Sequence, residues 1–185
     1  MRALTVVAAT VFLLVATTAT AHDRTWPGKK LGKALPQAKS FVQRVASLGP
    51  AQVAWVETAL GEPIRSEDKA PTFYVGTGAD GRSVGVVVFV DATGDNGKIE
   101  IGVALDPAGR LVNVVLYEHS ERGVDDRAFL DQLTGKTAAS KLKVGDDIQA
   151  NDDSKHAAQA IASAAKRGAL LAMAALGLGQ KAGTP

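Results

Sequence analysis

Cysteine is missing from the sequence, and its absence narrows the possible chemistry. None of the 185 residues is a cysteine. The protein therefore has no disulfide framework, no cysteine-ligated iron–sulfur cluster and no thiol nucleophile. We expect its stability to come from side-chain packing.

An excess of one charge is also missing. The sequence has 21 basic residues (Lys and Arg) and 19 acidic residues (Asp and Glu), and without Arg2 the basic residues number 20. Such a balance gives no basic face for a nucleic acid or for an anionic lipid surface. The charges therefore predict that no nucleic acid is a partner.

Long apolar runs are confined to the beginning of the chain. Arg2 precedes an apolar stretch over residues 3–16 and the small residues Ala19-Thr20-Ala21, which is the pattern of an export signal. We predict a signal peptide over residues 1–21 and a periplasmic or otherwise exported protein. The next apolar run, residues 168–179, is well short of the ~20 residues of a spanning helix, so we expect no membrane span in the mature chain.

The remaining chain has the length of one domain. Residues 22–39 contain Pro27, Pro36 and a basic Gly28-Lys29-Lys30, and they predict a flexible N-terminal arm. We expect a single domain over residues 40–178 and a short C-terminal tail over residues 179–185.

Apolar periodicity predicts an α+β domain with helices packed on an antiparallel sheet. Helical spacing over residues 41–48 and 53–60 predicts two short helices before the sheet. Strand patterns follow over residues 72–76, 84–90, 98–105 and 111–117, and Asp106-Pro107-Ala108-Gly109 fits a type I turn between the last two. Two more helices are expected over residues 125–133 and 154–176, the second with a stripe of small residues that faces the sheet.

The most informative segment is residues 111–136, where the last strand runs into a charged loop. This loop contains Glu118, His119, Glu121, Arg122 and Gly123, and polar groups at the end of a rigid strand often form ligand sites. A solvated turn explains the same residues equally well. The imidazole of His119 can accept and donate a proton, which suits proton-coupled chemistry.

This segment resembles the FMN-binding domain family. Members commonly show a strand ending in Glu, then His or Tyr, a Glu-containing turn with glycine, and a helix of the type F-L-D-Q-F-x-G-K-T. The matching residues here are Glu118, His119, Glu121, Gly123 and residues 129–137. The family includes periplasmic subunits of Na⁺-pumping NADH:quinone reductases and of Rnf complexes. The resemblance implies an FMN-binding-domain-like fold, an electron-transfer role and a redox partner protein, possibly membrane-bound.

The chain departs from the family where the last helix opens. Typical members carry D-I-x-A followed by S-G-A-T, whose threonine receives FMN covalently through its phosphate. This chain has Asp147-Ile148-Gln149-Ala150 followed, after Asn151, by Asp152, Asp153, Ser154 and Lys155. Lys155 in the threonine position cannot form the phosphoester, so the resemblance implies FMN that is at most noncovalently bound. Residues Asp152, Asp153, Ser154 and Lys155 would form one wall of its site, and Glu118, His119, Glu121 and Gly123 the other.

A helix N-terminus binds anions through its free N–H groups, but here a carboxylate could take that place. We predict that Asp152 or Asp153 caps the last helix with its own side chain and thereby weakens phosphate binding. Lys155 would offset one of these negative charges.

Two other functions are compatible with the sequence. One is a flavin-free binding or assembly module of a redox complex, because fold alone does not fix function. The other is copper binding through the amino group and imidazole of His22, with His119 and His156 as further ligands. The spacing of the histidines does not favour a metal site.

Overall fold

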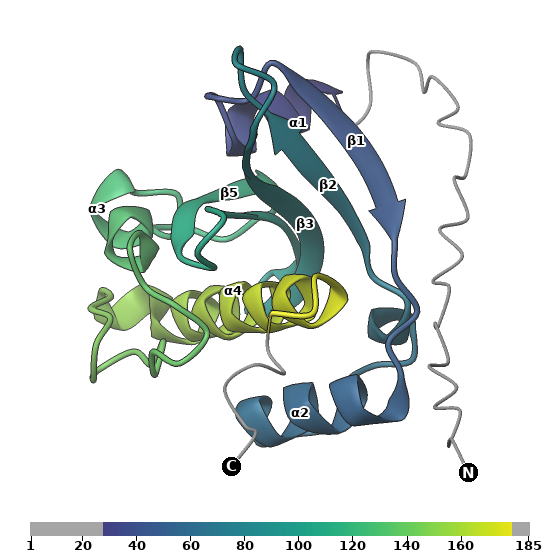
Figure 1. The fold of residues 1–185 in the computed structure, drawn as a ribbon. Coiled ribbons are helices and arrows are strands. Elements are labelled where there is room, and N and C mark those ends of the chain that lie inside the picture. The colour runs from purple at the N-terminus through teal and green to yellow at the C-terminus, as the bar shows by residue number, and fades with distance from the viewer. Residues whose placement is uncertain (1–27, 179–185) are drawn as a thin grey trace, which may run out of the picture.

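In the computed structural model, which describes residues 28–178, five antiparallel strands form one sheet (Figure 1). Each strand pairs with the next one along the chain, in the order β1–β2–β3–β4–β5. The strands are β1 Ser40–Val45, β2 Thr72–Thr77, β3 Ser83–Gly94, β4 Gly97–Leu105 and β5 Leu111–Glu118. The predicted signal peptide, His22 and the predicted tail lie outside the described residues.

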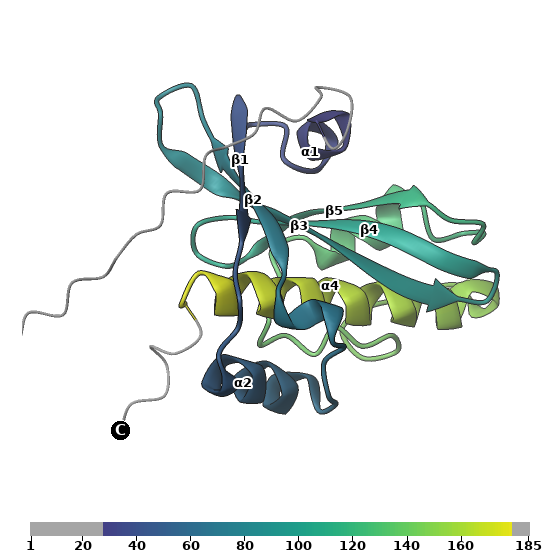
Figure 2. The same cartoon turned by 90° about the vertical axis from the view of Figure 1, so that its right-hand side faces the viewer.

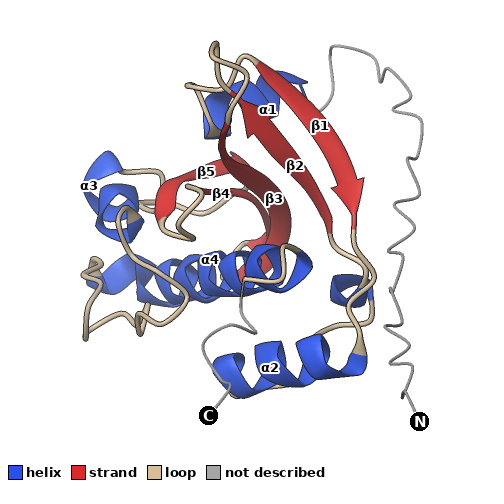
Figure 3. Cartoon of the chain, in the orientation of Figure 1, coloured by secondary structure: helices blue, strands red, loops and turns tan. Residues whose placement is uncertain are grey.

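Four helices accompany the sheet in this part of the chain (Figure 3). They are α1 Gly28–Ala34, α2 Pro50–Leu60, α3 Arg127–Leu130 and α4 Lys155–Ala175, and 3₁₀ turns lie at Glu67–Lys69, Asp131–Leu133 and Asp152–Ser154. The prediction of an α+β domain with an antiparallel sheet is therefore confirmed.

The turn between β4 and β5 forms as its sequence predicts. Asp106 Oδ1 accepts hydrogen bonds from the N–H groups of Ala108 and Arg110 at 2.8 and 2.9 Å. Gly109 follows with a φ of 79°, a left-handed conformation that glycine adopts without strain. This turn sets the two strands side by side, and their register shifts next to it, between Ala104 and Leu105.

The first predicted helix is wrong. Residues 41–48 have apolar side chains at helical spacing, yet Ser40–Val45 form strand β1 along the edge of β2. Short apolar runs fit both periods, and the open edge of β2 supplies backbone hydrogen bonds that an isolated short helix cannot match. The second predicted helix is confirmed as α2, which ends at Gly61 with a φ of 80°.

Helix α4 covers one face of the sheet and forms the main core with it. Ile99, Ile101 and Val103 of β4 point toward this face and are fully buried. A Cβ built on Gly168 of α4 would come within 3.0 Å of Val103 Cγ2, so the small residue allows the helix to approach closely. The predicted small-residue stripe therefore faces the sheet.

Residues 28–39 are not a flexible arm, because α1 packs on the opposite face of the sheet. Leu31, Ala34 and Leu35 are buried against Tyr74 and neighbouring side chains of the sheet. Their spacing of three and four residues is that of an amphipathic helix, a signal outweighed in the sequence by the flanking prolines. Figure 2 shows the resulting order of layers, with α1, the sheet, α4 and α2 one below another.

Candidate functional site

The last helix begins without a side-chain cap. A 3₁₀ turn over Asp152–Ser154 leads into α4, and neither Asn151 nor Ser154 caps the turn or the helix with its side chain. Ser154 Oγ donates instead to the backbone oxygen of Asn151 at 3.2 Å. A helix start without a side-chain acceptor favours an anion. The N–H groups of Ser154 and Lys155, however, already donate to the carbonyl oxygens of Asn151 and Asp152 within the turn.

The prediction that Asp152 or Asp153 caps this helix is wrong. A capping residue precedes the helix in an extended conformation, whereas both aspartates lie inside the 3₁₀ turn. Asp152 Oδ1 instead accepts from Lys155 Nζ at 2.6 Å, and this hydrogen bond lowers the pKa of Asp152. The predicted compensation of the acidic residues by Lys155 is thus present for Asp152.

The two predicted walls of the site meet at Gly123 and Ser154. Gly123 has a φ of 67°, and a Cβ built on it would lie 3.7 Å from both Cβ and Oγ of Ser154. The loop after β5 therefore passes directly over the start of α4, although the two segments are about thirty residues apart in sequence.

Glu121 is held in place by hydrogen bonds from the β3–β4 hairpin. It is 7% exposed, and its carboxylate accepts from the backbone N–H and the side-chain amide of Asn96 at 2.6 and 3.0 Å. Asn96 lies at the tip of the β3–β4 hairpin. Glu121 thus anchors this hairpin, and its carboxylate is already occupied by charge-assisted hydrogen bonds.

Helix α4 also contacts the hairpin tip. His156 Nδ1 lies 2.8 Å from Asp95 Oδ1, next to the residue that Glu121 binds. The hairpin tip, the loop after β5 and the start of α4 are therefore held together at one end of the sheet. No local pattern in the sequence predicts the Glu121–Asn96 or His156–Asp95 contacts. The first depends on the pairing of β5 with β4, and the second on the packing of α4 against the sheet.

Two predicted residues lie differently from the others. Glu118 is turned toward α1, with its carboxylate 3.6 Å from Lys30 Nζ and its side chain 80% exposed, so the structure does not bring it to the start of α4.

His119 is half-buried, and its Nδ1 is buried without a hydrogen-bond partner among residues 28–178. An unsatisfied buried nitrogen of this kind calls for a partner, and a ligand is one candidate.

A small hollow of about 210 Å³ lies beside the contact between the two walls. Its lining combines the loop, α3 and the segment before α4: Gly123, Asp126, Ala128, Phe129, Gln132, Gln149, Ala150 and Asn151. Ligand pockets commonly measure roughly 300–1,000 Å³. A ligand larger than this hollow would therefore be only partly enclosed.

Among residues 28–178, the structure does not bring together further ligands for the copper site suggested at His22. Within residues 28–178, no group of three or more His, Asp or Glu side chains is arranged to hold a metal ion. His22 lies outside the described residues. None of the helices in the same range is long and apolar enough to cross a membrane.

No protein-family model matches this sequence, and no curated protein matches it either.

Proposed function

We propose that this protein is an exported electron-transfer protein that binds FMN noncovalently at the start of α4. The observation that supports the proposal best is the contact of Gly123 with Ser154 at a helix start that no side chain caps. Close approach of small residues and free helix N–H groups are what a phosphate group requires.

The residues at the helix start fit the phosphate end of FMN. Lys155 supplies a positive charge, the 21 residues of α4 the helix dipole, and Ser154 a small side chain that allows close approach. Asp152 binds the same Lys155 ammonium, so a phosphate would compete with it. We therefore expect FMN binding to be weak and free of a covalent bond.

The isoalloxazine ring would lie over the loop after β5, where His119 Nδ1 is available as a hydrogen-bonding partner. When bound, FMN supplies the redox chemistry, while the protein contributes orientation and electrostatics. A ring that is only partly enclosed remains accessible to a redox partner protein, whether that partner is soluble or membrane-bound.

A flavin-free binding or assembly module is the second candidate. It is favoured by the exposed carboxylates of Asp152 and Asp153 at the place where the phosphate would bind. Two like charges at this position oppose an anionic ligand.

Titration of the purified protein with FMN, followed by flavin fluorescence, tests the proposal. We expect saturable binding that Lys155→Glu weakens and that the sequence Ser-Gly-Ala-Thr at positions 152–155 strengthens. Lys39→Glu is the matched control, because Lys39 is exposed at the start of β1 and makes no ion pair with another described residue.

Two results would contradict the proposal. Absence of saturable binding up to roughly millimolar FMN, where association is worth only about 4 kcal/mol, would favour the flavin-free module. An FMN mass added covalently to the wild-type chain would overturn the noncovalent assignment.

A further inference from the structure

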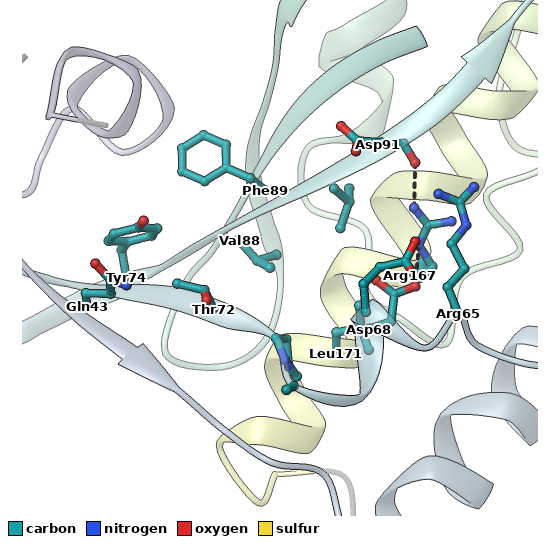
Figure 4. Close-up of a pocket in the computed structure, with 14 residues that line it drawn as sticks. Gln43, Arg65, Asp68, Thr72, Tyr74, Val88, Phe89, Asp91, Arg167 and Leu171 are labelled. Carbon is teal, nitrogen blue, oxygen red and sulfur yellow. Dashed lines mark hydrogen bonds and ion pairs between the residues drawn. The ribbon is translucent and has the colours of Figure 1, made fainter. Parts of the chain in front are cut away.

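The sheet opens between β2 and β3, far from the start of α4. Pairing of these strands ends at Phe73 with Val88, because the chain before Thr72 turns away into the 3₁₀ turn Glu67–Lys69 while β3 continues to Gly94. The divergence leaves a cavity of about 410 Å³, which lies within the usual range for small-molecule sites (Figure 4).

One end of this cavity is aromatic and apolar. Tyr74 and Phe89 pack edge to face on the α1 side of the sheet, with ring centroids 5.8 Å apart. Val88, Val90 and Leu171 line the cavity from the core on the α4 side. Tyr74 is 8% exposed, yet its hydroxyl forms no hydrogen bond with any residue in the described range. This hydroxyl is therefore available as a donor in an otherwise apolar setting.

The other end of the cavity is ionic, and most of its charges are compensated. Arg167 Nε lies 3.4 Å from Asp68 Oδ2, and Arg167 Nη2 donates to the backbone oxygen of Asp91 at 2.5 Å. The Asp91 carboxylate is bound by Lys98 at 3.1 Å. Asp68, Asp91 and Arg167 thus each have an oppositely charged neighbour, but Asp68 Oδ2 and Arg167 Nε are buried and make no hydrogen bond within the described part of the chain.

Arg65 is the basic side chain at this end that remains without such a contact. It is exposed, it lines the cavity, and it forms no hydrogen bond or ion pair through its guanidinium with another residue of 28–178. The nearby Glu67 carboxylate accepts a hydrogen bond from Ser66 Oγ at 3.2 Å. The Arg65 guanidinium thus offers a planar, two-pronged donor at the ionic end of the cavity, where its charge also acts on the neighbouring Glu67 and Asp68 carboxylates.

We propose that this cavity binds a small aromatic carboxylate. The carboxylate would pair with Arg65 in a bidentate arrangement, and the ring would lie in the opening between β2 and β3, beside Phe89. The Tyr74 hydroxyl would donate to an acceptor on the opposite side of the ring. Arg167 lies twelve residues along α4 from Lys155, about 18 Å at the rise of a helix, so this site is independent of the proposed FMN site.

Isothermal titration of the whole protein with 2-naphthoate tests the assignment. We expect saturable binding that Arg65→Gln weakens at least about tenfold, or about 1.4 kcal/mol. Arg82→Gln is the matched control, because Arg82 is an exposed arginine in the turn between β2 and β3 with no ion pair in the described chain. It should leave the affinity unchanged.

A neutral probe separates charge recognition from simple hydrophobic binding. We expect 2-naphthamide, which has nearly the same shape, to bind the wild type about tenfold more weakly than 2-naphthoate and to be indifferent to Arg65→Gln. Saturating FMN should leave the 2-naphthoate affinity unchanged. In NMR spectra, 2-naphthoate should change the chemical shifts of the backbone amides of residues 88–91.

Several outcomes would overturn the proposal. They are no saturable binding up to roughly millimolar 2-naphthoate, equal affinity for the amide, equal effects of Arg65→Gln and Arg82→Gln, or amide shifts confined to residues 119–124 and 151–156. Binding of 2-naphthoate in a protein that fails to bind FMN would support this site while contradicting the FMN proposal, so the two remain distinguishable.

Discussion

Two ion pairs formed by residues of α4 differ in how deeply they are buried. The distance between their charged atoms does not show this difference. Lys155 and Asp152 approach to 2.6 Å at the start of the helix, with 58% and 88% of their side chains exposed. Arg167 and Asp68 are farther apart, at 3.4 Å, but each side chain is only 13% exposed. The shorter pair lies in water, and the longer pair lies in the protein interior.

Burial, rather than separation, decides what each pair does to stability. Exposed pairs contribute little because water screens the charges and the side chains lose conformational freedom. A buried pair is costly to form, but removing one partner leaves the other charge uncompensated. Burial raises the pKa of Asp68 and lowers that of Arg167, although each partner opposes the shift of the other. Desolvation therefore exceeds the mutual attraction at this site.

The largest effect is expected when the buried pair is broken. Arg167→Met should lower the free energy of unfolding by about 3–5 kcal/mol, because Asp68 is left buried without its cation and the Asp91 carbonyl loses its donor. Urea unfolding measures this change. The double variant Asp68→Leu/Arg167→Met should recover much of the loss, and a double variant as unstable as the single one would contradict this account.

The same pair predicts the pH dependence of the Arg167→Met variant. Because the pKa of Asp68 is raised in the folded protein, protonation of Asp68 favours folding. Its contribution to stability is present at low pH and is lost as the pH rises through the folded-state pKa. Removing the cation raises this pKa further, so the destabilisation should be smaller near pH 4 than near pH 7, as urea unfolding at both pH values can show.

Glu121 extends the comparison to a buried carboxylate near the helix start. Glu121→Ala should cost about 1.5–3 kcal/mol, since it removes two charge-assisted hydrogen bonds from Asn96. Glu121→Gln should cost less, because the amide oxygen still accepts one of them. Faster hydrogen exchange at the Asn96 amide would report release of the hairpin tip, and unchanged exchange would mean that other contacts hold it.

Local patterns in the sequence predict the central part of the fold but not its edges. Strands β2 to β5, α2 and α4 follow from apolar period and from turn residues such as Asp106 and Gly109. Strand β1 and helix α1 do not, because Phe41 and Leu31 take their conformation from the sheet against which they pack. Short segments of this kind depend on tertiary contacts more than on local preference.

For the candidate site, the sequence predicts the proximity of Gly123 to the helix start, but not the roles of the charged residues. The family resemblance supplies that proximity. The hydrogen bonds of Glu121 depend on Asn96, which comes near because the end of β5 pairs with the start of β4. The Arg167–Asp68 pair likewise joins residues about one hundred positions apart.

A smaller effect is expected at Gly123. Gly123→Ala should cost about 1 kcal/mol, because the left-handed φ of 67° is unfavourable for a side chain with a Cβ atom. Gly123→Asn should cost less, since asparagine tolerates this conformation better. The Cβ would make only an ordinary contact with Ser154, so a much larger loss in urea unfolding would mean that the loop fits the helix more tightly than 3.7 Å indicates.

The smallest effect is expected at the exposed pair itself. Asp152→Ala and Asp153→Ala should leave the urea midpoint unchanged within error, because neither carboxylate caps the helix and Asp152 meets Lys155 in water. A loss typical of a true N-cap in either variant would show that a carboxylate bonds to the helix N–H groups in solution. The same variants should strengthen FMN binding, since each removes a negative charge beside the proposed phosphate position and Asp152→Ala also releases Lys155. If these variants are as stable as the wild type and bind FMN more tightly, the two carboxylates compete with the ligand and do not stabilise the fold.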